Sequence, residues 1–178
     1  MVIIKKAVFL DRDGTLIEDR GYMKSTDPIV FLPGIIEALQ KLTEMQYELV
    51  VVSNQSGIGR GLVSENDVLC INKMLSHLLG PFGIQIAAFY FCPHHPDDNC
   101  ECRKPKPGML LRALKERGID RSQSFMVGDK LSDAEAGIAA GITPVLISRS
   151  IQKATNHTVL RFGSLLEFVS FIDRIDAN

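Results

Sequence analysis

The chain has 178 residues, enough for one α/β domain with a hydrophobic core and too few for two domains of ordinary size. Hydrophobic residues make up 46% and charged residues 23%, which excludes an intrinsically disordered chain. The formal net charge is -1, so we expect no nucleic-acid partner and no polybasic membrane anchor. No apolar run is long enough to span a bilayer, and the N-terminal segment lacks the pattern of a signal peptide. We therefore expect one cytoplasmic domain over residues 1–178, with no membrane partner.

Short apolar segments alternate along the chain with longer amphipathic ones. The apolar segments predict five buried strands, at Ala7–Leu10, Leu49–Val52, Ala87–Phe91, Phe125–Val127 and Pro144–Ile147, and a short extended piece at Val30–Leu32. The amphipathic segments predict helices after Gly34, from Ser64 to about Leu79, over Gly108–Arg117, over Leu131–Ala140 and after Ser164. This alternation predicts a Rossmann-like three-layer αβα sandwich with a mainly parallel sheet.

Polar residues stand where the predicted strands end. Asp11, Ser53 with Asn54, Cys92 and Asp129 end or follow the first four of them. In open α/β sheets, ligands bind beyond the carboxyl ends of the strands. The sequence therefore predicts a ligand site at this edge of the sheet.

The most informative motif is Asp11-Arg12-Asp13-Gly14-Thr15. Two carboxylates two residues apart on an extended chain point to the same side, and they repel unless a cation or a shared proton separates them. Gly14 permits a sharp turn. An Asx-turn that leaves a strand is the alternative interpretation of the same residues.

The segment F-L-D-R-D-G-T-L resembles the haloacid dehalogenase superfamily of phosphohydrolases. The resemblance implies that Asp11 attacks phosphorus and forms an aspartyl-phosphate. It implies that Asp13 protonates the leaving oxygen and then activates water. It also implies a bound Mg²⁺ that bridges Asp11 and the phosphate, with the backbone carbonyl of Asp13 as a further ligand. The resemblance implies the fold of this superfamily, and the length of the chain leaves no room for a large cap domain.

Three further motifs follow in the family's order. Ser53 matches the hydroxyl that donates to the phosphoryl group, although a strand-terminal serine is often a simple turn residue. Lys104, in Arg103-Lys104-Pro105-Lys106-Pro107, matches the lysine that neutralises charge on the transferring group. Arg103 is then expected to contact phosphate or sugar, whereas the alternative is a charge cluster facing water.

The fourth motif is Val127-Gly128-Asp129-Lys130-Leu131-Ser132-Asp133. Asp129 matches the second carboxylate on Mg²⁺, and Lys130 is expected to meet the substrate. Asp133 lies one helical turn further on, and its role stays open between a helix-start acid and a partner beyond the metal ligands.

Three of the four cysteines lie within residues 92–102. Cys92, His94, Cys100 and Cys102 have the spacing C-x-H…C-x-C, which can close around a tetrahedral zinc ion. A set of four protein ligands leaves no open position, so this Zn²⁺ is expected to be structural. The competing interpretations are a disulfide, which would leave an odd cysteine, and His95 as the ligand in place of His94.

The block C-P-H-H-P…C-x-C-R-K-P-x-P-G-M is similar to a narrow group that contains heptose-bisphosphate phosphatases and histidinol-phosphate phosphatases. This resemblance implies a substrate loop with Asp19, Gly21 and Tyr22, and a loop after the second strand with Asn54 and Arg60. Without a large cap, loops must supply specificity for a small phosphorylated sugar.

Three functions remain open at this stage. The first is a Mg²⁺-dependent heptose-bisphosphate phosphatase on the route to the heptose of lipopolysaccharide. The second is a histidinol-phosphate phosphatase, and the third is a zinc-organised binding module without catalysis. A monomer is expected in each case.

Overall fold

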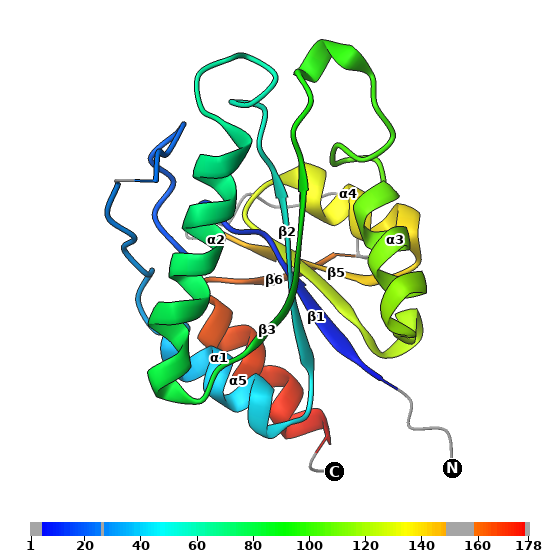
Figure 1. The fold of residues 1–178 in the computed structure, drawn as a ribbon. Helices are drawn as coiled ribbons and strands as arrows, with labels where there is room; N and C mark the ends of the chain where they lie inside the picture. The colour runs from blue at the N-terminus through cyan, green and yellow to red at the C-terminus, as the bar shows by residue number, and fades with distance from the viewer. Residues whose placement is uncertain (1–4, 26, 149–158, 177–178) are drawn as a thin grey trace.

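The computed structural model describes residues 5–25, 27–148 and 159–176 (Figure 1). These residues form one parallel sheet with the strand order β3-β2-β1-β4-β5-β6. The strands are β1 (Ala7–Leu10), β2 (Glu48–Asn54), β3 (Ile86–Cys92), β4 (Phe125–Gly128), β5 (Thr143–Ile147) and β6 (Leu160–Phe162). The helices are α1 (Ile35–Glu44), α2 (Glu65–Leu79), α3 (Gly108–Arg117), α4 (Leu131–Ala140) and α5 (Leu165–Asp176).

The sheet has a hydrophobic core on each face, because successive side chains of the buried strands point to opposite faces of the sheet. In β1, Val8 and Leu10 pack into a core shared with α1, α2 and α5. Ala7 and Phe9 point the other way, into a core shared with α3 and α4. The predicted three-layer sandwich is therefore confirmed (Figure 1).

The strand order decides where a ligand can bind. From β1 the chain builds outward to β2 and β3, and it then returns to build outward on the other side through β4, β5 and β6. In such a doubly wound sheet, a crevice forms at the carboxyl ends of the two strands where the order reverses. Here these strands are β1 and β4, which are followed by Asp11 and Asp129.

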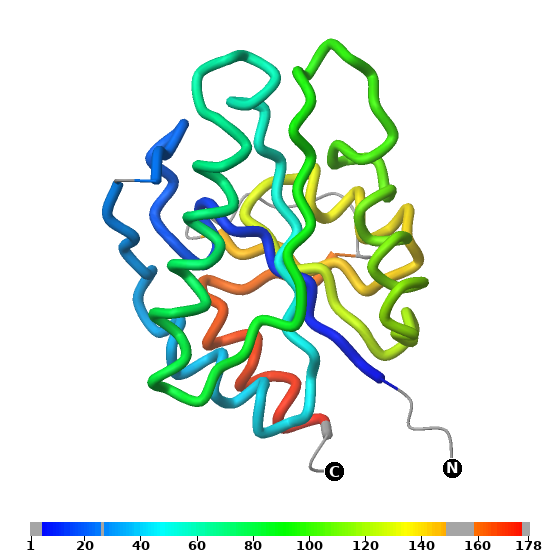
Figure 2. The backbone as a smooth tube through the Cα atoms, viewed as in Figure 1, coloured from blue at the N-terminus to red at the C-terminus, as the bar shows by residue number. Residues whose placement is uncertain are grey.

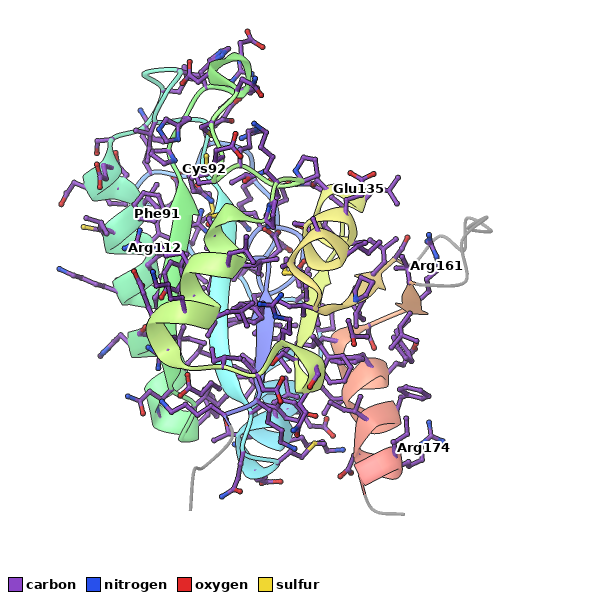
Figure 3. All side chains as sticks on the ribbon, turned by 90° about the vertical axis from the view of Figure 1, so that its right-hand side faces the viewer. Phe91, Cys92, Arg112, Glu135, Arg161 and Arg174 are labelled. Carbon is purple, nitrogen blue, oxygen red and sulfur yellow. The ribbon has the colours of Figure 1, made fainter. Side chains whose placement is uncertain are left out.

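The loops at that edge supply the rest of the surface (Figure 2). The segment after β2 and the segment between β3 and α3 project beyond the sheet side by side, and the Gly59 N–H donates to the Pro93 carbonyl at 2.8 Å. Figure 3 shows Cys92 at the end of β3 and Glu135 of α4 towards the same end of the molecule. None of these loops carries a separate domain in the described part of the chain, so the expectation of no large cap is confirmed.

The predicted helices and the first five strands are confirmed, with shifts of a few residues at their ends. The Ser64–Asp67 capping box is present: the Ser64 hydroxyl accepts from the Asp67 N–H at 3.1 Å, and the Asp67 carboxylate accepts from the Ser64 N–H at 2.9 Å. The prediction missed β6, because its three residues are only partly buried and are too few to establish a periodic pattern. Val30–Leu32 forms no named strand; only Phe31 makes an isolated bridge, to Ile17. Among the described helices, none is long and apolar enough to cross a membrane.

Phe168 of α5 is the aromatic centre of the core beneath β4, β5 and β6. Its side chain is fully buried, with ring centroids 5.1 Å from Phe125 and 5.6 Å from Phe162. We predict that Phe168→Ala lowers the free energy of unfolding by about 3–5 kcal/mol, through lost contacts and a cavity. Urea denaturation measures this loss. The control is Phe171→Ala on the same helix, where the side chain is only partly buried and the loss is smaller. Equal losses in the two variants contradict the prediction.

Candidate active site

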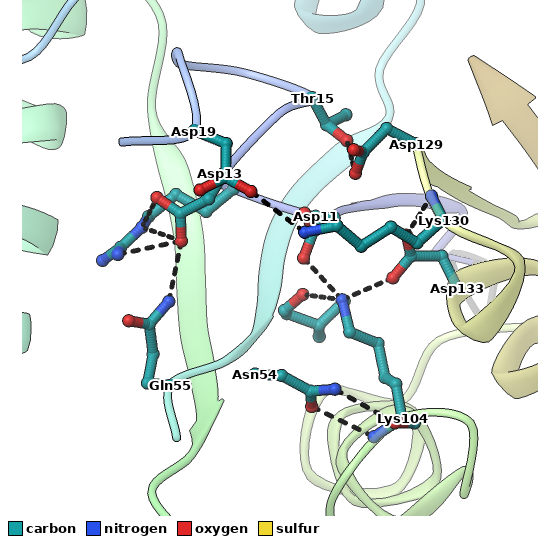
Figure 4. Close-up of polar contacts among 12 residues, drawn as sticks. Asp11, Asp13, Thr15, Asp19, Asn54, Gln55, Lys104, Asp129, Lys130 and Asp133 are labelled. Carbon is teal, nitrogen blue, oxygen red and sulfur yellow. Dashed lines mark hydrogen bonds and ion pairs between the residues drawn. The ribbon is translucent and has the colours of Figure 1, made fainter. Parts of the chain in front are cut away.

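Three carboxylates meet at the edge where the strand order reverses (Figure 4). Asp11 follows β1, Asp129 follows β4, and Asp133 lies in the first turn of α4. One oxygen of each lies within 4.8 Å of the other two. Asp11 and Asp133 are buried, so their charges repel with little screening by water. This cluster therefore requires positive charge nearby.

Lys104 supplies part of that charge. Its Nζ lies 2.6 Å from Asp11 Oδ1 and 2.7 Å from Asp133 Oδ1, and it donates to the Val52 carbonyl at 2.8 Å. These three acceptors match the three donors of an ammonium group. Asn54 holds the Lys104 backbone by two hydrogen bonds of 3.0 Å, one to its carbonyl and one from its N–H. Lys104 is thus buried and fixed between two carboxylates.

Burial and charge act against each other on these groups. Burial raises the pKa of Asp11, and the Lys104 ammonium limits the rise. Burial also raises the pKa of Asp129, while Lys130 opposes it. Burial by itself lowers the pKa of Lys104, but Asp11 and Asp133 outweigh burial and raise it. Asp11 and Asp133 therefore share one buried ammonium group, Asp129 lies beside them as a third carboxylate, and the remaining negative charge attracts a further cation.

The Asp13 carboxylate turns toward Arg12 and Gln55 instead of joining the three. Arg12 Nη2 donates to Asp13 Oδ2 at 3.0 Å, and Gln55 Nε2 donates to the same oxygen at 2.8 Å. The expectation that Asp11 and Asp13 point to one side is corrected here, because β1 ends at Leu10 and the chain turns. Asp13 keeps 15% of its side-chain surface exposed.

Gly14 makes this turn possible. Its φ of 91° lies in the left-handed region, which side chains rarely adopt. A Cβ at Gly14 would also stand 2.5 Å from an oxygen of Asp129. Only glycine lets the chain after β1 pass so close to the carboxylate after β4.

A cavity of about 400 Å³ opens beside these groups. The loops after β1 and β2, the Arg103–Lys104 segment and the start of α4 all contribute to it. Its lining includes most of the residues expected at the site: Asp13, Asp19, Gly21, Tyr22, Asn54, Arg103, Lys104 and Lys130.

Two basic side chains of the cavity differ in their contacts. Lys130 Nζ pairs with Asp19 Oδ2 at 3.1 Å, and Asp19 also accepts from the Gly21 N–H at 3.0 Å. Although burial opposes them, the Gly21 N–H and Lys130 lower the pKa of Asp19. Arg103 Nη1 is buried and has no hydrogen-bond partner among the described residues. A buried N–H of this kind is costly, so Arg103 is suited to bind an anion.

Four of the residues expected at the phosphate site lie outside the lining. Asp11 and Asp129 belong to the carboxylate cluster next to the cavity, and the other two are Ser53 and Arg60. Ser53 is buried near the end of β2, between Asn54 and Val52, whose carbonyl accepts from Lys104, and it is not one of the residues that line the cavity. Arg60 is exposed in a turn further along that loop. Because Arg60 is exposed and is not one of the residues that line the cavity, its position does not support the expected contact with a substrate.

A second cluster lies in the loop between β3 and α3. Cys92 Sγ lies 3.5 Å from both His94 Nδ1 and Cys100 Sγ. Cys102 Sγ lies 3.2 Å from His94 Nδ1 and 3.6 Å from Cys100 Sγ. Each residue offers one ligand atom, so the four together could hold a metal ion.

The geometry also answers two questions about this loop. The cysteines are free thiols, which is against the disulfide alternative. His95 Nδ1 accepts a hydrogen bond from the Asp97 N–H at 3.2 Å, so His94 and not His95 faces the thiols. Cys102 lies two residues before Lys104, and the Cys92 carbonyl accepts from the Gln55 N–H at 2.8 Å. The cluster therefore connects the loops that carry Lys104 and Gln55.

Sequence reasoning missed three residues of the site and left a fourth open. Arg12 and Gln55 both bind the Asp13 carboxylate, and Asn72 of α2 binds Arg12. Nothing in the pattern around Asn72 distinguishes it from a surface residue of an amphipathic helix. Asp133 proves to hold both places: it accepts from the Lys130 N–H at 3.0 Å as the cap of α4, and it pairs with Lys104.

The fold and the site define a class: an α/β enzyme in which a carboxylate cluster and a buried lysine adjoin a basic cavity. The family model of the haloacid dehalogenase-like hydrolases matches residues 18–141, and the chain belongs to this family.

Named relatives cover most of the chain. A D-glycero-β-D-manno-heptose-1,7-bisphosphate 7-phosphatase of Pasteurella multocida is 43% identical over 178 residues, 97% of each chain. The Yersinia pestis enzyme of the same name is 47% identical over 149 residues, 79% of each chain. The crystal structure of a D,D-heptose 1,7-bisphosphate phosphatase from B. bronchiseptica, complexed with magnesium and phosphate, has a TM-score of 0.87 at 30% identity. It covers 97% of this chain and 99% of its own.

We predict that Lys104→Met destabilises the protein by about 3–5 kcal/mol in the presence of EDTA, because two buried carboxylates lose their counter-charge. Urea denaturation measures the change. The matched control is Lys106→Met, two residues away, where the ion pair with Glu101 is exposed and worth less than about 1 kcal/mol. A Lys104→Met variant as stable as the control would show that the carboxylates do not depend on this ammonium.

Proposed function

We propose that this protein is a phosphatase that removes the 7-phosphate of D-glycero-β-D-manno-heptose 1,7-bisphosphate through an aspartyl-phosphate. The observation that carries the proposal is the position of Asp11, with Lys104 Nζ at 2.6 Å and the basic cavity beside it. The names of the relatives supply the substrate. The hydrolase family argues against the alternative of a binding module without catalysis.

In the first half of the proposed reaction, a carboxylate oxygen of Asp11 attacks phosphorus, and the bond between phosphorus and the sugar oxygen breaks. Protonated Asp13 gives its proton to that leaving oxygen, so the product departs as an alcohol. Lys104 and the Ser53 hydroxyl stabilise the charge on the phosphoryl oxygens.

In the second half, the Asp13 carboxylate takes a proton from a water molecule, which attacks phosphorus as the bond to Asp11 breaks. Inorganic phosphate leaves, and Asp11 is free as a carboxylate again. Asp13 ends protonated, ready for the next turnover, so atoms and charges balance over the cycle.

The residues present fit the Mg²⁺ of the related crystal structure. Oxygen donors from Asp11 and Asp129 lie close together with too little positive charge around them, and Mg²⁺ prefers such carboxylates. We propose that these two residues and the Asp13 carbonyl hold it, with Asp133 on Lys104 beside them. When bound, Mg²⁺ neutralises charge where an anionic phosphate approaches an anionic nucleophile.

We propose that the cavity binds the sugar and its second phosphate. Arg103 has an unpaired buried N–H to offer an anion, and Lys130 can exchange Asp19 for a phosphate oxygen. Asp19, Gly21 and Tyr22 also line the cavity, and we propose that hydroxyl groups of the sugar lie against them. We propose in addition that the protein is a cytoplasmic monomer of one domain.

We propose Zn²⁺ as the ion of the Cys₃His cluster, in a structural role. Zinc–sulfur bonds of about 2.3 Å at tetrahedral angles place sulfurs about 3.8 Å apart, near the 3.5 and 3.6 Å observed. Burial raises the pKa of the Cys92 thiol to about 12, so forming its thiolate requires a strong cation. Four protein ligands leave no position for a substrate.

The nucleophile is tested by Asp11→Asn, which we expect to lower kcat by at least about 10³-fold, since an amide cannot form the phosphoenzyme. Release of inorganic phosphate is followed with the β- and α-anomers of the heptose bisphosphate and with histidinol phosphate. The β-anomer should give the highest kcat/KM in the parent enzyme. Activity of Asp11→Asn near that of the parent contradicts the covalent mechanism, and preference for histidinol phosphate contradicts the substrate.

The structural metal is tested by Cys100→Ala, with Cys70→Ala as the matched control. Cys70 lies on α2, outside the cluster. We expect Cys100→Ala to lose about one equivalent of zinc by mass spectrometry of metals and to lower activity, because the loop that leads to Lys104 loosens. Cys70→Ala should keep both. A zinc-free Cys100→Ala enzyme with the activity and stability of the parent would argue against this role.

A further inference from the structure

Arg12 is a charged side chain buried almost completely, at 1% exposure, beside the proposed acid and base. Taking a guanidinium group out of water is unfavourable unless its N–H groups find partners. Arg12 Nη1 donates to Asn72 Oδ1 at 3.1 Å, and Nε and Nη2 donate to the Asp13 carboxylate at 3.0–3.1 Å. These hydrogen bonds connect three side chains in series: Asn72, Arg12 and Asp13.

This series of hydrogen bonds links the loop after β1, which carries Asp13, to α2. Asn72 is itself buried, at 5% exposure, on the face of α2 that also buries Val68, Ile71 and Leu75. Its side chain therefore has a fixed position, and the planar guanidinium transmits that position to Asp13. Arg12 thus holds the Asp13 carboxylate, while Asp13 remains one of the residues that line the cavity.

The two oxygens of Asp13 are not equivalent. Oδ2 accepts from Arg12 Nε, from Arg12 Nη2 and from Gln55 Nε2, at 3.1, 3.0 and 2.8 Å. Oδ1 accepts only from Arg12 Nε, at 3.1 Å, among the donors of the described residues. Since Oδ2 already accepts from three donors and Oδ1 from one, Oδ1 is the oxygen with room for a further hydrogen bond to a substrate or a water molecule.

We propose that Arg12, anchored by Asn72, is a positioning residue that holds Asp13 so that its Oδ1 exchanges the proton with the leaving oxygen and then with water. The inference rests on the proposed function, because it assumes that Asp13 is the acid and base. It adds a side chain of α2 to the residues on which the reaction depends.

Loss of this positioning has a specific kinetic signature. A sugar oxygen is a poor leaving group and needs the proton, whereas p-nitrophenolate leaves without one. A badly placed Asp13 therefore slows the first half of the reaction for the sugar phosphate but not for p-nitrophenyl phosphate. The second half needs Asp13 with both substrates, so p-nitrophenol should appear in a burst, followed by slow turnover.

The test uses Asn72→Ala and Asn72→Asp in the full-length enzyme loaded with metal. We expect Asn72→Ala to lower kcat on the heptose bisphosphate about 10-fold with KM unchanged, and to show the burst with p-nitrophenyl phosphate. Asn72→Asp keeps an oxygen acceptor for Arg12, and its kcat should stay within about twofold of the parent. Ile71→Val, on the same helix and equally buried, is the control for packing and should leave kcat and the absence of a burst unchanged.

A thermal melt establishes that each variant is folded. If Asn72→Ala does not fold, Arg12→Lys takes its place, because a lysine keeps the charge but cannot span Asn72 and Asp13 together; it should show the same fall in kcat and the same burst. Parent kinetics in the folded variant, a rise in KM in place of the fall in kcat, or no rescue by Asn72→Asp would overturn the inference.

Asp13→Ala separates this inference from the proposed function. If Asp13→Ala retains the activity of the parent on the heptose bisphosphate, both fail. If Asp13→Ala is inactive while Asn72→Ala behaves like the parent, the inference alone fails. An inactive Asp13→Ala with the burst in Asn72→Ala supports both.

Discussion

The ammonium group of Lys104 is the contact on which the site depends, because it lies between two carboxylates that are themselves out of water. Asp11 and Asp133 come from different elements, and each would repel the other at this distance without it. The same contact brings together three segments far apart in the chain: the end of β1, the start of α4 and the loop before α3. The same ion pairs therefore balance the charge of the site and hold three segments of the fold together.

The surrounding loops hold the backbone of Lys104 in place. Its backbone is fixed by Asn54, and the Cys₃His cluster ends only two residues earlier. A polar loop of this length has little core of its own, so the metal proposed for the cluster would replace hydrophobic packing as the source of its shape. In the described residues, loops at the edge of the sheet form the cavity where many α/β enzymes use a second domain.

Much of this arrangement could be predicted from sequence, and the exceptions have physical reasons. The order of strands and helices follows from hydrophobic periodicity and capping, and the acidic residues follow from their places after β1 and β4. The metal-ligand spacing of the cysteines was visible as well. By contrast, the partners of Asp13 could not be predicted, because Arg12 is buried against Asn72 sixty residues later and local rules place arginines in water. Asp133 was ambiguous because a helix cap and a partner of lysine have the same sequence signature, and it is both. The three residues of β6 are too short for a periodic signal.

The double role of Asp133 has a consequence for how this protein can change. One of its oxygens caps the N-terminus of α4 and the other faces Lys104, so replacement by an aliphatic residue removes a cap and a counter-charge at once. An asparagine at this position could keep the cap but not the charge that faces Lys104, and an aliphatic residue would keep neither. Compensation would require a second change at Lys104, which is held by the proposed chemistry. Selection on Asp133 therefore acts at once on the cap of α4 and on the ion pair with Lys104.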